Sequence, residues 1–342
     1  MANIFAKFRK DIGIDLGTAN IVVYAKDKGI VLREPSVVAL DKKTRNVLAT
    51  GEEAKLMLGR TPSNIVALRP LRDGVIVDFE ITEYMIHNFI KKVSKRNHFF
   101  KPIVIIGVPS SITHVESRAV IEAAYQAGAH KVYLIEEPMA AAIGSNLPIS
   151  EPSGHLIADI GGGTTEVAVI SFGGIVVSNS IKVAGDEMDD AIISHCRRNY
   201  NLLIGERTAE QIKIELGSAY PGSEETDIKI TGRDMVSGLP KTFTLSSSEI
   251  RHSILDPINT IVQAIKFTLE QTPPELSSDI MENGIYLAGG GALLRGLDKF
   301  IEEETGLYPT IVDDPLSVVA YGTGKALQNI DLLDKVLIKG KP

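Results

Sequence analysis

The chain has 342 residues, of which 44% are hydrophobic, and a net charge of −7 at pH 7. This length predicts about two globular domains, and the acidic balance argues against a nucleic-acid partner, which would need a basic face. The single cysteine excludes a disulfide framework and a zinc-binding spacing, and it suits a reduced cytoplasmic setting. No apolar run approaches the roughly 18 residues that a membrane-spanning helix needs, and no signal peptide is evident.

The first ten residues, MANIFAKFRK, can form an amphipathic turn of helix. Ile4, Phe5 and Phe8 fall on one helical face beside three basic residues. Such a segment can lie on an anionic membrane surface. It can equally be a frayed terminus, so the sequence alone leaves both interpretations open.

The next stretch, DIGIDLGTANIVVYAKDKGIVL, predicts a β-hairpin over residues 12–24. Asp15 ends the first apolar run, and Gly17, Thr18, Ala19 and Asn20 form the turn before the second run. Backbone N–H groups in a glycine-containing turn can converge on an anion. A carboxylate at a strand end can hold Mg²⁺ through water.

Residues 33–67 read as a small inserted lobe with two short strands and a short helix. Hydrophobic residues then recur at helical spacing over residues 81–96. The following loop, NHFFK, places Phe99 and Phe100 among basic residues. Aromatic side chains in basic surroundings suit membrane contact, but loop aromatics also fold back onto a core, and the sequence does not decide between these two.

Residues 103–108 form an apolar run typical of a buried central strand, and residues 131–135 predict another strand. Glu136, Glu137 and Pro138 follow that second strand. Because successive strand side chains point to opposite faces, only one of the two carboxylates can face a cleft. Proline fixes Glu137 at a strand-to-helix junction, where it can orient a water molecule or simply be an ordinary charge at a helix start.

Residues 150–154 (SEPSG) mark a boundary, and the hairpin pattern then recurs as LIADIGGGTTEVAVISFGGIVV. Asp159 matches Asp15, and Gly161, Gly162, Gly163 and Thr164 form the second turn. One such hairpin would be unremarkable in any protein. Two matched copies predict a clamp that holds the phosphates of a nucleotide from both sides, whereas the competing interpretation is two hairpins without a ligand.

The C-terminal part predicts four helices and another glycine-rich turn. Residues 189–200, 208–216, 248–269 and 318–327 read as helices, and Thr208 is expected to cap the second. Glu210 and Lys213 share one helical face, so they can touch a ribose or base edge or form a surface ion pair. Residues 181–245 include a second small lobe, and Gly289, Gly290 and Gly291 follow a strand at 285–288, where backbone can approach a nucleotide.

Together these motifs resemble the actin, heat-shock chaperone and hexokinase ATPase superfamily, and within it the MreB-type bacterial actins, which include the Mbl and MreBH paralogues. The motifs are DIGIDLGTAN, LRPLRDGVI, LIEEPMAAAIG, DIGGGTTEVAVIS, AGDEMDDAI, IGERTAEQIK, TPPEL and GGGALLRGL, spread from near the first residue to about residue 327. A set of motifs in this order is far more specific than any single glycine pattern.

The resemblance implies a role for each matching position. Asp15 and Asp159 would hold Mg²⁺ through water, and Glu137 would polarise the attacking water with help from Thr164. Ile4, Phe5, Phe8, Phe99 and Phe100 would contact the membrane. The implied ATP-binding residues are Asp15, Gly17, Thr18, Ala19, Asn20, Asp159, Gly161, Gly162, Gly163, Thr164, Glu210, Gln211, Ile212, Lys213, Gly290, Gly291, Ala292 and Leu293.

The resemblance also implies the fold: an α/β actin-like ATPase with two duplicated domains, each with a five-stranded mixed sheet and a small lobe, and a nucleotide cleft between them. The first domain would comprise residues 1–150 and 321–342, with its small lobe at about 33–67. The second would comprise residues 151–320, with its small lobe at about 181–245.

The implied function is a filament-forming ATPase at the inner face of the cell membrane that organises cell-wall synthesis and rod shape. Its expected partners are a second copy of itself in paired protofilaments, membrane lipid and the proteins of cell-wall elongation, with no nucleic acid. The alternative is a monomeric chaperone or small-molecule kinase. A chaperone would need a peptide-binding domain after the ATPase part, and this chain ends at residue 342.

Overall fold

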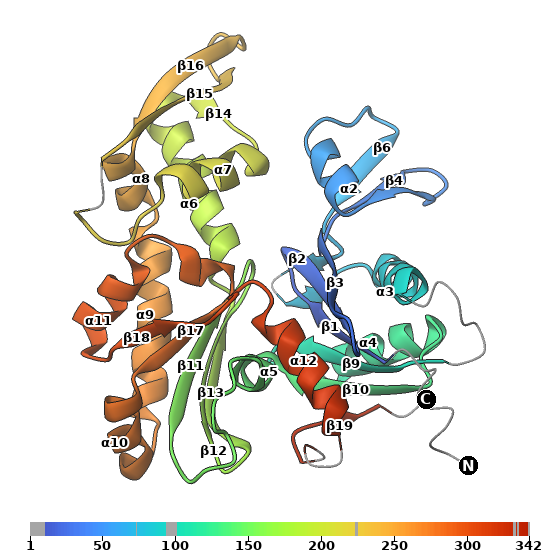
Figure 1. Cartoon of the computed structure of the whole chain (residues 1–342). Helices are drawn as coiled ribbons and strands as arrows, with labels where there is room; N and C mark the ends of the chain where they lie inside the picture. Colours follow the sequence, from blue (N-terminus) through green and yellow to red (C-terminus); the bar gives the residue numbers. More distant parts are fainter. Residues whose placement is uncertain are drawn as a thin grey trace.

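The computed structural model describes residues 11–72, 74–93, 101–222, 225–330, 333 and 335–340. Two halves lie side by side, and each is built on one mixed β-sheet with a smaller lobe at the same end of the molecule (Figure 1). The predicted α/β class with a duplicated architecture is therefore confirmed. The predicted membrane segments, which contain Ile4, Phe5, Phe8, Phe99 and Phe100, lie outside the described residues.

The sheet of the first half contains six strands in the order β19-β10-β9-β1-β2-β3. Strand β1 is central: it pairs antiparallel with β2 and parallel with β9. Five strands were expected, and the sixth is the two-residue edge strand β19, which pairs with β10. The strands are β1 (Ile12–Leu16), β2 (Asn20–Ala25), β3 (Gly29–Pro35), β9 (Ile103–Val108), β10 (Lys131–Glu136) and β19 (Ile338–Lys339).

The sheet of the second half repeats this arrangement with five strands in the order β13-β12-β11-β17-β18. Strand β11 pairs antiparallel with β12 and parallel with β17, as β1 does with β2 and β9. The repeated hairpin of the sequence therefore occupies equivalent places in the two sheets. The strands are β11 (His155–Ile160), β12 (Thr165–Ser171), β13 (Gly174–Ile181), β17 (Ile285–Ala288) and β18 (Pro309–Ile311).

Each half carries a separate three-stranded sheet in its smaller lobe. In the first half these strands are β4 (Val38–Asp41), β5 (Val47–Thr50) and β6 (Ile65–Leu68), with helix α2 (Glu52–Met57) and a short ribbon of β7 (Leu71–Arg72) and β8 (Val75–Ile76) nearby. In the second half they are β14 (Leu202–Leu203), β15 (Asp227–Asp234) and β16 (Pro240–Ser246). The predicted domain limits at residues 150 and 321 stay a prediction.

The remaining helices cover the sheets and build the second lobe. They are α3 (Phe79–Val93), α4 (His114–Gln126), α5 (Glu137–Gly144), α6 (Gly185–Tyr200), α7 (Glu206–Leu216), α8 (Ser247–Ser253), α9 (Leu255–Glu270), α10 (Pro274–Asn283), the 3-10 turn η1 (Gly290–Leu293), α11 (Leu297–Thr305) and α12 (Val318–Gln328). None of the described helices is long and apolar enough to cross a bilayer.

Two helix predictions were wrong in detail. The single helix expected over residues 248–269 is two helices, α8 and α9, with the break at Ile254. Pro257, in the first turn of α9, has no N–H to continue a helix from the preceding turn. Helix α7 begins at Glu206 after Gly205, so Thr208 does not cap it.

Helices α5 and α12 cross between the two sheets and join the halves (Figure 1). A Cβ atom on Gly322 would lie 1.8 Å from the Ala140 carbonyl oxygen, and one on Gly144 would lie 2.1 Å from the Val318 carbonyl oxygen. Only glycine permits backbones this close. The Lys325 ammonium also donates to the Ile143 carbonyl oxygen at 3.1 Å, so α12 holds the C-terminal end of α5.

His155 at the start of β11 is a buried imidazole whose two ring nitrogens have no hydrogen-bond partner among the described residues. Burial lowers the pKa of His155 below its usual value, against an opposing effect of Glu151 and Asp279. The unfolded chain therefore binds this proton more tightly than the folded chain does.

We predict that unfolding becomes easier as the pH falls below about 6.5, the ordinary histidine pKa, and that His155→Leu removes part of this loss. Denaturant unfolding between about pH 7 and about pH 5 measures it. His87→Leu, at an exposed position on α3, is the control and should retain the full pH dependence. Equal slopes for His155→Leu and the wild type would contradict the assignment.

Candidate functional site

A cavity of about 450 Å³ lies between the two halves, and most of the predicted binding residues line it. It opens between the turn of the β1–β2 hairpin and the turn of the β11–β12 hairpin. The predicted residues at its wall are Asp15, Gly17, Thr18, Ala19, Asn20, Glu137, Asp159, Gly161, Gly162, Gly163, Thr164, Glu210, Lys213, Gly290, Gly291 and Leu293.

The two hairpin turns approach each other so closely that side chains would collide. A Cβ atom on Gly162 would lie 2.6 Å from Cβ of Ala19 in the opposite turn. A Cβ atom on Gly17 would lie 2.7 Å from the Asn20 carbonyl oxygen of its own turn. Glycine therefore brings backbone from both halves to one place, which suits an anion held by N–H groups.

Asp15 and Asp159 end the first strands of the two hairpins and carry mutually repelling charge. Burial and, to a smaller extent, the neighbouring Asp159 together raise the pKa of Asp15 to about 8. Burial raises the pKa of Asp159 to about 7, with a contribution from Glu166. Two carboxylates that resist ionisation in the same cleft form a site whose charge a cation would stabilise.

Glu137 lines the cavity at the first residue of α5, whereas Glu136 does not line it. The predicted junction between strand and helix is present, but it lies one residue earlier than expected: Glu136 has extended backbone at the end of β10, the helix begins at Glu137, and Pro138 is its second residue. Only 9% of Glu137 is exposed, and burial raises its pKa well above the usual value, with further contributions from Asp15, Asp159 and Glu166. The carboxyl group of Glu137 thus lies in the same cavity as the two hairpin turns.

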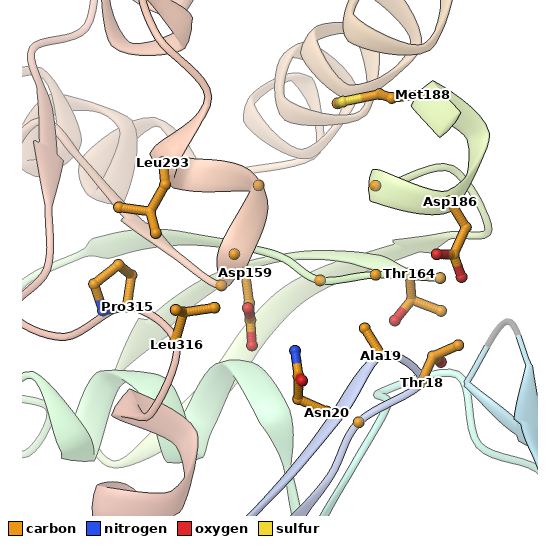
Figure 2. Close-up of a pocket in the computed structure, with 18 of the residues that line it drawn as sticks. Thr18, Ala19, Asn20, Asp159, Thr164, Asp186, Met188, Leu293, Pro315 and Leu316 are labelled. Carbon is orange, nitrogen blue, oxygen red and sulfur yellow. The ribbon is translucent and has the colours of Figure 1, made fainter. Parts of the chain in front are cut away.

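The cavity has a polar end and an apolar end (Figure 2). Thr18, Ala19, Thr164 and Asp186 gather around the two turns, and Leu293, Pro315 and Leu316 lie at the other end of the view. Asn20 and Asp159 point toward one another between these ends. A ligand with phosphates on one side and a planar, largely apolar ring on the other would match this division.

Glu210 and Lys213 project from one face of α7 into the cavity, but both have protein partners. The Lys213 ammonium lies 2.9 Å from Asp189 Oδ1 and donates to the Gly185 carbonyl oxygen at 2.7 Å. Glu210 lies 2.8 Å from the Lys55 ammonium of the opposite lobe. The alternative of a surface ion pair between Glu210 and Lys213 was therefore wrong, because each residue pairs with another partner. Their contact with a ribose or base edge stays a prediction.

Three predicted binding residues do not line the cavity: Gln211, Ile212 and Ala292. Gln211 donates to Glu215 on the surface of α7, while Ile212 is buried in the core of the second half. The helical period explains this result, because residues 210, 213, 214 and 217 share the face that lines the cavity. Ala292 belongs to η1, and its side chain is buried.

Several lining residues were not assigned from the sequence, notably Arg69, Asp186, Met188, Leu316 and Ile214. Arg69 lies in the motif LRPLRDGVI and Asp186 in AGDEMDDAI, so both motifs carried an unused signal. Their partnership is visible only in the fold: the Arg69 guanidinium reaches from the first half to Asp186 of the second at 3.4 Å.

No group of three or more His, Cys, Asp or Glu side chains in the described ranges is placed to hold a metal ion directly. Mg²⁺, however, is usually bound through one or two carboxylates together with water and phosphate oxygens. Asp15 and Asp159, facing each other and short of compensating charge, fit that kind of site.

These two sheets, with a hairpin turn from each facing across a cleft, define the actin-like class of nucleotide-binding fold. The structure of MreB5 from Spiroplasma citri bound to ADP has a TM-score of 0.91 at 42% identity, covering 96% of this chain and 98% of that one. The same protein bound to AMPPNP matches equally well.

The chain belongs to the MreB/Mbl family, whose model, described as MreB/Mbl protein, matches residues 9–335. The cell shape-determining protein Mbl of Bacillus subtilis is 54% identical over 328 residues, which cover 96% of this chain and 98% of that protein. The cell shape-determining protein MreB of Escherichia coli is 54% identical over 331 residues, covering 95% of each. The resemblance inferred from the motifs is thereby confirmed.

The Lys55–Glu210 pair links α2 to α7 across the mouth of the cleft (Figure 1). We predict that Lys55→Gln speeds the release of a bound nucleotide by up to about fivefold, because a partly exposed ion pair contributes roughly 0.2–1 kcal/mol. Stopped-flow displacement of a fluorescent ATP analogue measures this rate.

Lys266→Gln is the control, since Lys266 pairs with Glu304 within the second half. Its release rate should equal that of the wild type. An unchanged rate for Lys55→Gln would show that the pair does not hold the cleft closed.

Proposed function

We propose that this chain is a filament-forming, membrane-associated cytoskeletal ATPase that organises cell-wall synthesis and rod shape. The observation that carries the proposal is the pair of glycine turns facing each other across the cleft, with Asp15, Asp159 and Glu137 beside them. The names of the Bacillus and Escherichia relatives, both cell shape-determining proteins, support the cellular role. The ADP-bound and AMPPNP-bound Spiroplasma structures support an adenine nucleotide as the ligand.

In this proposal the backbone N–H groups of residues 17–20 and 161–164 hold the phosphates of ATP. Glu137 orients a water molecule for in-line attack on the γ-phosphate, with Thr164 beside it. In this role the ionised carboxylate of Glu137 accepts a hydrogen bond from that water. The apolar residues Leu293, Pro315 and Leu316 take the adenine.

Asp15 and Asp159 would hold Mg²⁺ through water, and the ion would neutralise charge on the β- and γ-phosphates. The two carboxylates lie in different halves of the molecule. Binding of the metal and phosphates would therefore favour a closed cleft.

We further propose that copies of the chain assemble as paired protofilaments at the inner face of the cell membrane. Ile4, Phe5, Phe8, Phe99 and Phe100 would contact lipid, and proteins of cell-wall elongation would bind the polymer. The chain carries a net charge of −7, so an anionic bilayer repels it on average. Basic residues beside these apolar side chains reverse that repulsion locally, at about 1 kcal/mol per charge.

For the chemistry, we predict that Glu137→Ala binds ATP with affinity equal to or tighter than that of the wild type but hydrolyses it about 10²–10⁴-fold more slowly. The variant loses the group that orients water while removing one negative charge from the cleft. Single-turnover hydrolysis and calorimetry measure the two quantities.

Glu136→Ala is the matched control for this prediction, because Glu136 is the adjacent carboxylate and does not line the cavity. It should hydrolyse ATP at nearly the wild-type rate. If both variants hydrolyse ATP normally, Glu137 is not the catalytic carboxylate. Sedimentation with ATP separates the filament from the monomeric alternatives, since a chaperone or small-molecule kinase yields no pelletable polymer.

For the membrane, we predict that Phe99→Ser with Phe100→Ser and deletion of residues 1–8 abolishes flotation with anionic liposomes. A few buried apolar side chains contribute about 1.5–3 kcal/mol each at most, so one subunit binds weakly and a filament binds through many linked contacts. Polymer should still pellet with ATP in the absence of lipid.

Phe172→Ser removes an aromatic side chain that is 76% exposed elsewhere on the surface, and it should leave flotation intact. Continued flotation of the deletion variant at moderate salt would place the membrane-binding surface elsewhere.

A further inference from the structure

Glu166 is a buried carboxylate outside the cavity that none of the roles described so far uses. It lies on β12, opposite Asp159 on β11 and opposite Ser180 on β13. Only 1% of its surface is exposed. Its side chain therefore lies directly beside one of the two phosphate-facing aspartates, where an uncompensated charge would be costly.

The hydrogen-bond partners of Glu166 come from both halves of the molecule. Its Oε2 accepts from the backbone N–H of Ser110 at 3.1 Å and also from the Ser110 hydroxyl. Its Oε1 accepts from the Ser180 hydroxyl at 2.5 Å. Ser110 belongs to the loop after β9 in the first half, whereas Ser180 belongs to β13 in the second. One carboxylate thus joins the halves behind the cleft.

The loop that Glu166 holds packs against residues that line the cavity. Pro109 precedes Ser110, and a Cβ atom on Gly74 would lie 2.8 Å from Cγ of Pro109 and 3.1 Å from Cγ2 of Thr164. The Gly74 N–H donates to Thr18 Oγ1 at 3.2 Å. Pro109, Gly74, Thr18 and Thr164 therefore pack together, with residues of both turns among them.

A second contact joins the same loop to the second sheet. The hydroxyl oxygens of Ser111 and Ser180 are 2.9 Å apart, so the next residue of the loop also meets β13. The loop is consequently fixed to the sheet of the second half at two successive residues: Ser110 bonds to Glu166, and Ser111 meets Ser180, which itself donates to Glu166.

We propose that Glu166 is a positioning residue for ATP hydrolysis: it holds the 109–111 loop against the second sheet and so keeps Thr18 and Thr164 in register across the phosphate site. The proposal rests on the proposed ATPase function. Glu166 does not touch the nucleotide. It acts through Ser110, Pro109 and Gly74, so its loss displaces the residues that orient the reacting groups and leaves the binding surfaces in place.

The experiment compares Glu166→Ala with Glu166→Gln in the full chain with Mg·ATP. Glu166→Ala should lower kcat by about 10- to 100-fold, since small misplacements near reacting groups have effects of this size, with KM within about threefold of the wild type. Glu166→Gln should retain kcat within about threefold, because its amide oxygen still accepts from Ser110 and its amide nitrogen can donate to Ser180.

Ser110→Ala is the second variant, and it keeps the test decisive if Glu166→Ala does not fold. It should also lower kcat, and the loss in the Glu166→Ala, Ser110→Ala double variant should be smaller than the product of the two single losses, because both act through one contact. Arg33→Gln is the control: it removes another contact between the halves, the Arg33–Asp314 pair at 2.9 Å, and should leave kcat within about twofold.

Three results would overturn the positioning role: normal kcat in Glu166→Ala and Ser110→Ala, a rise in KM with kcat unchanged, or a loss in Glu166→Gln as large as in Glu166→Ala. An absence of hydrolysis by the wild type would instead refute the ATPase function, which keeps the two failures distinct.

Discussion

The constraint on which this structure depends is the gathering of negative charge at facing strand ends. Asp15, Asp159 and Glu137 all line one cavity, and burial raises the pKa of each. Such groups can be stabilised by protonation, by distance or by a cation. The two hairpins fix the distance, which leaves protonation or a cation. In the proposed function, a metal ion carried by a polyphosphate would supply that cation.

Contacts between the halves become less buried from the base of the cleft to its mouth. At the base, α5 and α12 cross with backbone-to-backbone contact and share an apolar core with strands of both sheets. In the middle, Glu166 forms buried polar contacts with Ser110 and Ser180. At the mouth, Lys55–Glu210 and Arg69–Asp186 are partly exposed ion pairs. The apolar core should therefore hold the halves together most strongly, the buried hydrogen bonds less strongly and the ion pairs least. Opening of the cleft is accordingly expected to be easiest at its mouth.

The sequence predicted those parts of the site whose residues stand next to one another in a recognisable local pattern. The hairpin turns were recognisable because an apolar run, an aspartate and glycines stand next to one another in two copies. Glu137 was recognisable because strand alternation and Pro138 decide which of two carboxylates faces the cleft. The fold class was predicted from the family resemblance that these and the other motifs carry.

The rest depended on tertiary placement. Leu316 reaches the cavity from a segment with no local signal for ligand binding, and the partner of Arg69 lies in the other half of the molecule. Gln211 and Ile212 were included although the helical period turns them away from the cavity. Glu166 stood within an apolar strand pattern, where one carboxylate gives no hint of a partner in the other half. The apolar periodicity continues through the break between α8 and α9 and therefore suggested one helix. Pro257, which cannot donate a backbone hydrogen bond to the preceding turn, instead favours two helices.

The α5–α12 crossing has a mechanical consequence. The chain passes from the first sheet to the second before β11 and returns through α12 to β19, so both passages lie at one end of the cleft. Two adjacent chain crossings can serve as a hinge, about which the halves would rotate on one axis. The two hairpin turns lie nearer that hinge than the small lobes do (Figure 1). A slight closure around a ligand would therefore move the lobe tips by a larger distance and would change the surface that the molecule presents to its neighbours.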